Sequence, residues 1–156
     1  MSFLNSLNIS ASALTAQRQR LDIISENVAN IDTTRTEAGG AYRRKLVVLE
    51  DKAGDLSFKD SLNRAVVEKD ANGRLVRQDY SPGVRVSAIV EDQSALKTEY
   101  NPQHPDADAD GYVQRPNVNM LEETIDSMSA SRSYQANVVV LNAVKLMAQK
   151  ALEIGK

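Results

Sequence analysis

Apolar residues recur along the C-terminal run Asn117–Ile154, mostly at steps of three or four, which is the repeat of one side of an α-helix. The run contains no proline or glycine, and at about 1.5 Å per residue it predicts a helix about 50 Å long. Such a helix is longer than a small domain needs, so its apolar side requires a partner. The positions of the stripe are Leu121, Ile125, Met128, Tyr134, Val138, Leu141, Val144, Ala148 and Leu152.

The N-terminal residues 3–31 form a second amphipathic stretch. Leucine and valine recur there at intervals of seven, with isoleucines three positions later, and Ser10 and Gln17 are the polar exceptions. This spacing is typical of a coiled-coil seam, and equally of an amphipathic helix lying on its own domain's core. The helix is expected to end near Asn30–Thr34, where polar residues with poor helix preference gather. The seam consists of Leu7, Leu14, Leu21 and Val28 together with Ile24 and Ile31.

The middle of the chain has the shorter patterns of β-strands. Tyr42–Glu50 and Val84–Glu91 are rich in strand-forming residues, and Ala95–Tyr100 is expected to pair with Val84–Glu91 through a turn at residues 92–94. Arg74–Gln78 predicts a short strand after the turn signal Asn72-Gly73, whereas residues 56–67 fit neither a helical nor a strand period.

A loop is expected over Asn101–Asn117, with Asn117 as the N-cap of the final helix. The predicted fold class is therefore α+β. Long terminal helices pair in a coiled-coil-like layer, and a small β-rich domain lies between them. The expected divisions are an N-terminal helix over residues 1–34, a middle domain over 35–116 and a C-terminal helix over 117–156.

Composition narrows the range of functions. The chain has 156 residues, a net charge of −2, no cysteine and few aromatic residues. The charge does not favour nucleic-acid binding, and the lack of cysteine excludes disulfides and thiol catalysis. The start of the chain lacks the pattern of a cleaved signal peptide, and no apolar run has the length of a membrane span. No phosphate-binding or hydrolase motif is present, so the sequence predicts neither an enzyme nor a cofactor.

One loop carries a candidate metal motif. Asp106, Asp108 and Asp110, followed by Gly111, match the first half of an EF-hand calcium loop, but the twelfth position holds Asn117 where a bidentate glutamate belongs. A polar turn is the simpler interpretation, so these aspartates are only a weak metal candidate. His104 is the single histidine and predicts no zinc site or triad. The run Arg43–Lys45 is expected to be a solvated strand face, with an acidic partner as the alternative.

Two stretches resemble the bacterial flagellar basal-body rod proteins, and within them the proximal rod proteins of FlgC type. Residues 22–34, DIISENVANIDTT, are similar to the N-terminal signature shared by rod and hook proteins. In the second half, PNVN at residues 116–119 and SASRSYQAN at residues 129–137 are similar to the proximal-rod type. The resemblance covers both ends of the chain, and residues 37–77 match poorly.

This resemblance implies a structural subunit whose terminal helices pack with those of neighbours into a helical drive-shaft tube for motility. The implied partners are copies of the chain, other rod proteins, the inner-membrane ring with its rod adaptor, and the type III export apparatus. Nucleic acids and small-molecule substrates are not expected. The implied location is the periplasmic rod of the basal body, reached without a cleaved signal peptide. The alternative is a soluble cation-binding or protein-binding module whose helices form an intramolecular hairpin.

Fifteen residues are predicted to form the subunit interface, because they follow the two apolar stripes or the N-terminal signature. They are Leu7, Leu14, Leu21, Ile24, Asn27, Val28, Asn30, Ile31, Met128, Tyr134, Val138, Leu141, Val144, Ala148 and Leu152. Ser10, Gln17, Ser131 and Asn142 are the polar positions expected to set register within the stripes. Asn27 and Asn30 are expected either to cap the first helix or to bind a neighbour.

Overall fold

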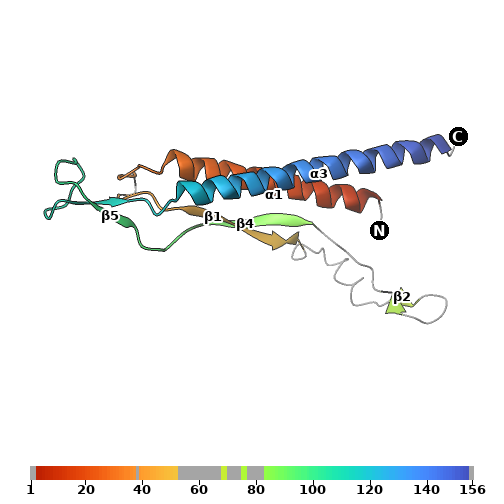
Figure 1. Cartoon of the computed structure of the whole chain (residues 1–156). Coiled ribbons are helices and arrows are strands. Elements are labelled where there is room, and N and C mark those ends of the chain that lie inside the picture. Colours follow the sequence, from red (N-terminus) through yellow and green to blue (C-terminus); the bar gives the residue numbers. More distant parts are fainter. Residues whose placement is uncertain (1–2, 38, 53–67, 70–74, 77–82, 155–156) are drawn as a thin grey trace.

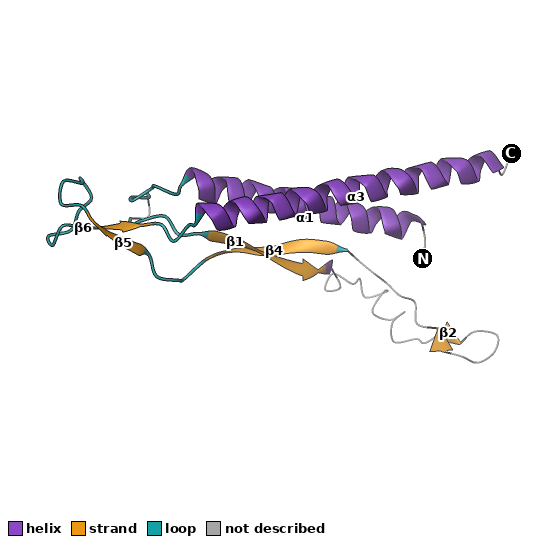
Figure 2. Ribbon diagram, viewed as in Figure 1, coloured by secondary structure: helices purple, strands orange, loops and turns teal. Residues whose placement is uncertain are grey.

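Two terminal helices lie next to each other, and short antiparallel strands lie along one side and at one end of the pair (Figures 1 and 2). The computed structural model describes residues 3–37, 39–52, 68–69, 75–76 and 83–154. Helix α1 is Phe3–Ala29 and helix α3 is Met120–Ile154, and this arrangement confirms the α+β class. Neither helix has an apolar segment of the length and purity that a membrane crossing requires, within the residues described.

The helices α1 and α3 lie side by side and antiparallel, so the two chain termini are at the same end of the molecule (Figure 1). At about 1.5 Å per residue, the 27 residues of α1 span about 40 Å and the 35 residues of α3 about 52 Å. The longer helix therefore projects past the start of the shorter one, as Figure 1 shows. Part of its surface has no partner among the residues that the structure describes.

The start of α3 differs from the prediction. The capping residue is Asn119, whose Oδ1 accepts a hydrogen bond from the backbone N–H of Leu121 at 3.1 Å. The expected cap, Asn117, is wrong because its side chain is occupied elsewhere: its Oδ1 accepts from the backbone N–H of Arg44 at 2.8 Å. The sequence offered two asparagines with the same capping ability, and tertiary contacts decided between them.

Strand pairing follows a different order from the one predicted. Strand β1, Lys45–Asp51, pairs antiparallel with β4, Val84–Glu91, with an irregularity between Val48 and Leu49. Strand β5, Lys97–Tyr100, pairs with β6, Tyr112–Arg115, which was expected to be part of a loop. The remaining pair joins β2, Glu68–Lys69, to β3, Leu75–Val76.

The predicted pairing of Ala95–Tyr100 with Val84–Glu91 is wrong, because the chain is diverted after β4. The backbone N–H of Asp92 donates to Arg44 O at 2.8 Å, and the Asp92 side chain then accepts from the N–H of Ser94. Gly111 instead permits the turn before β6 through a φ of 80°. The expectations for residues 56–67 and for Asn72-Gly73 fall outside the described residues.

The packed seam between the two helices includes small and polar side chains beside apolar ones. On α3 the buried residues Glu123, Ala130 and Val144 recur at multiples of seven, and on α1 Ser10 and Ile24 are buried in the same rhythm. Leu7, Leu14 and Leu21, which were predicted to form the α1 seam, are only half-buried. Helix α1 also packs against β1 and β4, and towards its N-terminal end it lies between α3 and this sheet (Figure 1).

Candidate assembly surface

A buried polar cluster joins the C-terminal end of α1 to β1 and to α3. At its centre Asn27 is 1% exposed and makes four hydrogen bonds. Its Nδ2 donates to Lys45 O at 3.0 Å and to Glu123 Oε2 at 3.1 Å, while its Oδ1 accepts from the Lys45 N–H and the Tyr42 hydroxyl, both at 2.9 Å. The amide is fully satisfied, so it fixes the three elements in one arrangement.

Glu123 continues this cluster with a buried ion pair. The residue is 1% exposed, and its Oε1 accepts from Arg44 Nε at 2.6 Å. Arg44 also reaches Asp126 at 3.3 Å, and Asp126 accepts from Arg20 at 3.0 Å. Arginine and carboxylate therefore alternate from Arg20 on α1, through Asp126 on α3 and Arg44 before β1, back to Glu123 on α3. A buried, hydrogen-bonded pair of this kind favours one arrangement of the elements over others, although it adds little net stability.

Tyr42 stays neutral within this cluster. Burial, together with the negative charges of Glu26, Glu123 and Glu91, raises the pKa of Tyr42 to about 12. The hydroxyl is therefore a hydrogen-bond donor to Asn27 throughout the physiological range. Lys45 lies 5.7 Å from the centre of the tyrosine ring and pairs with Glu26.

The basic run Arg43–Lys45 is thus a set of internal contacts, and its interpretation as a solvated strand face is wrong. Arg44 and Lys45 meet carboxylates from α3 and α1, and Arg43 donates to the backbone carbonyls of Asp92 and Ser94 at 3.3 Å. The acidic residues of α1 and α3 lie far from this run in the sequence, so local charge patterning does not predict the pairing. The fold brings the cations of this run together with these carboxylates around Asn27, and we call this cluster the junction.

The side of α3 opposite this junction exposes an apolar stripe, here called the outer face. Val139 is 66% exposed and Leu146 60%, and both continue the interval of seven that begins at Ile125 and passes through Arg132. An interval of seven keeps residues on nearly the same side of a helix. An exposed stripe whose side chains are mostly apolar marks an interaction surface. The outer face consists of Leu121, Ile125, Met128, Arg132, Val139 and Leu146.

Both helices carry matches to known families. The family model described as "Flagella basal body rod protein" matches residues 7–35, and the one described as "Flagellar basal body rod FlgEFG protein C-terminal" matches residues 109–154. The flagellar basal-body rod protein FlgC of Bacillus subtilis strain 168 is 48% identical over 160 residues, covering 100% of both chains. The FlgC proteins of Borreliella burgdorferi and Escherichia coli O6:H1 are 41% and 42% identical, with at least 98% of each chain covered. This chain belongs to the FlgC family of flagellar basal-body rod proteins.

Membership of the FlgC family makes the chain a structural subunit of the flagellar basal-body rod. The matched regions contain most of α1 and α3, which are also the helices that meet at the junction around Asn27. The relatives align along the whole chain, so the sequence similarity also covers the strands between the two helices.

The fifteen predicted interface residues are distributed over several environments in this FlgC-family chain. Three are buried within the chain: Ile24, Asn27 and Val144. Three are exposed: Met128, Tyr134 and Leu152. The others are half-buried: Leu7, Leu14, Leu21, Val28, Asn30, Ile31, Val138, Leu141 and Ala148. The first group already has partners inside the subunit, and the exposed group is available to neighbours.

The two signature asparagines have different roles. Asn30 bonds the helix end, since its Nδ2 donates to Glu26 O at 2.9 Å, which agrees with the capping interpretation. Asn27 instead joins α1 to β1 and α3.

The aspartate loop has a structural explanation. Asp106 accepts from the Thr34 hydroxyl at 2.8 Å and lies 3.8 Å from Arg35, while Asp108 and Asp110 are exposed. Among the described residues, no group of three or more histidine, aspartate or glutamate side chains is arranged to hold a metal. His104 accepts from the backbone N–H of Asp106 at 3.1 Å, so it stabilises the loop.

Sequence reasoning missed several residues of the junction and the outer face. Glu123, Arg44, Tyr42 and Asn117 carry no local pattern that reveals their pairing, because each partner lies at least 15 residues away. Val139 and Leu146 do carry such a signal. They extend the interval of seven from Ile125, which a search for a second stripe on the same helix would have found.

Proposed function

We propose that this FlgC-family subunit builds the rod through its two terminal helices, which pair in a coiled-coil-like manner and present the outer face of α3 to neighbouring subunits. The observation that carries the proposal is the apolar stripe that stays exposed after α1 has packed against α3. Contacts between different patches of identical subunits generate open helical assemblies when the rotation does not close. The predicted interface residues that are exposed or half-buried would border this contact.

The partners in this proposal are copies of the chain and other rod proteins, with the inner-membrane ring and rod adaptor at one end. Export through the flagellar type III apparatus, without a cleaved signal peptide, would deliver the subunit to the periplasmic rod. The role is structural and non-enzymatic. In support, the hollow of about 310 Å³ between α1 and β1 is lined by Arg44, Lys45, Glu123 and Asp126, whose charges already pair with one another or with Glu26.

A test of this function replaces an outer-face valine with a charge. Val139→Lys should prevent rod assembly, because a lysine buried without a partner at a subunit contact has a desolvation penalty of several kcal/mol. The variant would be produced as the only FlgC-type protein of a flagellated bacterium that the unchanged chain supports. Swimming and the number of basal bodies seen by electron microscopy are the measurements.

The matched control is Gln149→Lys, which introduces the same residue at an exposed polar position of α3. It should assemble and swim like the unchanged chain. Circular dichroism of both purified variants would establish that the helices are kept. Normal assembly of Val139→Lys would contradict the proposed role of the outer face.

A further inference from the structure

The two-stranded sheet of β1 and β4 has two free edges. In an antiparallel pair, alternate residues bond the partner strand, and the residues between them direct their N–H and C=O away from it. The backbone N–H of Asp92 donates to Arg44 O, which places Arg44 among the residues that face β4. The extra residue at the irregularity lies in β4, so the alternation of β1 continues past it. Lys45, Val47 and Leu49 therefore direct their backbone groups to the free edge of β1.

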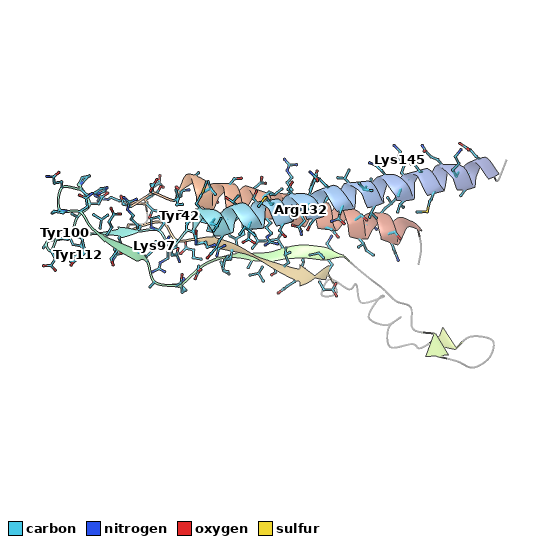
Figure 3. The ribbon with its side chains drawn as sticks, in the orientation of Figure 1. Tyr42, Lys97, Tyr100, Tyr112, Arg132 and Lys145 are labelled. Atoms are coloured by element: carbon cyan, nitrogen blue, oxygen red, sulfur yellow. The ribbon has the colours of Figure 1, made fainter. Side chains whose placement is uncertain are left out.

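Helix α1 caps one stretch of each free edge with a polar side chain. The Asn27 amide bonds both the N–H and the C=O of Lys45, as a neighbouring strand would. From this junction, which Tyr42 marks in Figure 3, β1 runs alongside the two helices. At the opposite end of the sheet, Ser12 Oγ accepts from the N–H of Val84 at 3.1 Å. Unpaired edges invite pairing with another chain, and natural proteins usually cover them.

The rest of the β1 edge is open. Among the described residues, none bonds the backbone N–H or C=O of Val47 or Leu49 on the side that faces away from β4. The hollow of about 310 Å³ lies along this stretch, and its apolar lining includes Ile23 and Ile24 of α1 together with these two residues of β1. An open strand edge therefore borders an apolar hollow directly after the position that Asn27 caps.

The charged side chains around the hollow already have partners inside the subunit. The pairs are Arg20 with Asp126, Arg44 with Glu123 and Asp126, and Lys45 with Glu26. A charged group that entered the hollow would lose water without gaining a free counter-charge, which is unfavourable. Apolar side chains, by contrast, gain from contact with the isoleucines of α1. The lining therefore selects an occupant whose side chains are uncharged.

We propose that the open edge of β1 at Val47 and Leu49 binds an extended, uncharged segment of a partner protein by strand addition. Free N–H and C=O groups along an edge are complementary to another extended backbone. In this mode of recognition main-chain hydrogen bonds give affinity, and pockets for alternate side chains give specificity. The Asn27 amide occupies the first position of the added ladder, so the segment begins at Val47, with apolar side chains against Ile23 and Ile24. The site is separate from the outer face of α3 and does not depend on it.

Binding of a synthetic probe to the purified full-length chain tests this site. The probe is the pentapeptide TVTVT with blocked ends. The comparison peptide has the same sequence but is N-methylated at its three central residues, which removes the N–H groups that strand pairing needs. Two-dimensional NMR of the isotope-labelled chain should show saturable shifts of the amide signals of Val47 and Leu49 with TVTVT, and none with the N-methylated peptide.

Two proline variants identify the edge that the peptide uses. Val47→Pro removes an outward N–H and leaves the ladder with β4 intact, because this N–H does not face β4. It should weaken the binding of TVTVT about two- to tenfold, which is the net contribution of one hydrogen bond. The matched control is Ile89→Pro, which lies opposite Val47 and removes an outward N–H from the edge of β4 instead. Its binding of TVTVT should equal that of the unchanged chain.

Several results would overturn the proposal. They are no binding of TVTVT, equal binding of the N-methylated peptide, and binding of the peptide DVDVD as tight as that of TVTVT, since the occupant would then not be uncharged. Self-association of the unchanged chain in sedimentation that Val47→Pro abolishes and Ile89→Pro keeps would also overturn it, because the occupant would be a second copy. If a proline variant does not fold, the comparison of the two peptides on the unchanged chain still decides whether strand addition occurs.

Discussion

The two sides of α3 differ in polarity and in whether their side chains have partners inside the subunit. Towards α1 and the segment before β1, Glu123 and Asp126 are polar residues with hydrogen-bonded partners inside the subunit. On the outer face, Val139 and Leu146 are apolar residues that are exposed. Buried polar groups with complete pairing specify one internal arrangement, and exposed apolar groups favour association. One helix thus separates the residues that define the subunit from those that can join subunits.

The largest effect on stability is expected from removing the buried carboxylate of Glu123. Glu123→Ala should lower the free energy of unfolding by about 3–5 kcal/mol, because Arg44 loses its buried partner and the Asn27 amide loses an acceptor. Urea unfolding of the purified chain, followed by circular dichroism, measures the change. The control is Glu122→Ala on the same turn. Glu122 is 60% exposed and 3.7 Å from Arg44, so its loss should change the free energy by less than about 1 kcal/mol. Equal effects of the two substitutions would contradict the role given to Glu123.

A second test concerns the place where β4 meets α1. Gly83 has a φ of 90°, and a Cβ there would lie 2.3 Å from Ser12 Oγ, which accepts from the N–H of Val84. Gly83→Ala should therefore lower the free energy of unfolding by about 1–3 kcal/mol, through backbone strain and displacement of Ser12.

Gly39→Ala is the matched control for this test. Gly39 has a similar φ of 86°, but a Cβ added there would meet no atom within 4 Å, so only the backbone strain remains. A clearly smaller loss is expected in urea unfolding of Gly39→Ala. If both variants lose the same stability, the contact between Gly83 and Ser12 does not hold the sheet against α1.

A third test uses the pH dependence of the junction. The pKa of Tyr42 is about 12 in the folded chain, against 10.0 for an ordinary tyrosine, so the folded state keeps this proton more tightly than the unfolded state. The stabilising effect is complete below pH 10 and is lost as the pH rises from 10 towards 12. The difference in unfolding free energy between the unchanged chain and Tyr42→Phe should shrink over this interval. A constant difference would show that Tyr42 does not titrate in the way its burial implies.

Sequence reasoning reached the features that local periodicity encodes. The bounds of β4 were predicted at Val84–Glu91, and α1 ends at Ala29, next to the expected end near Asn30–Thr34. Pairing was harder to predict, because it depends on contacts over long separations. Asn117 had the local preference of an N-cap, yet its side chain bonds Arg44, 73 positions earlier. The strands after β4 were misassigned for the same reason, since the bonds of Asp92 divert the chain.

The phase of the long helix shows where periodicity becomes ambiguous. Leu121, Ile125 and Met128 were grouped with Leu141 and Val144 as one stripe, but the first three are exposed and Val144 is buried. Helix α3 carries apolar residues on two sides, and a spacing of three or four cannot tell which side packs inside the subunit. The buried side is identified by Glu123 and Ala130, a charged and a small residue that an apolar pattern does not count.

The last test concerns the exposed apolar residues of the outer face, where a substitution should change the stability of the subunit least. Leu146→Ser on the outer face removes an apolar side chain that is 60% exposed in the single subunit. Because that side chain leaves little water on folding, urea unfolding of the purified chain should shift by no more than about 0.5 kcal/mol. The same substitution should reduce rod assembly, since the leucine is buried only when a neighbour covers it.

Val144→Ser, two positions away and 8% exposed, should instead destabilise the isolated chain. Were Leu146→Ser to unfold the chain as readily as Val144→Ser, the outer face would belong to the subunit's own core, and the separation of the two sides of α3 would not hold.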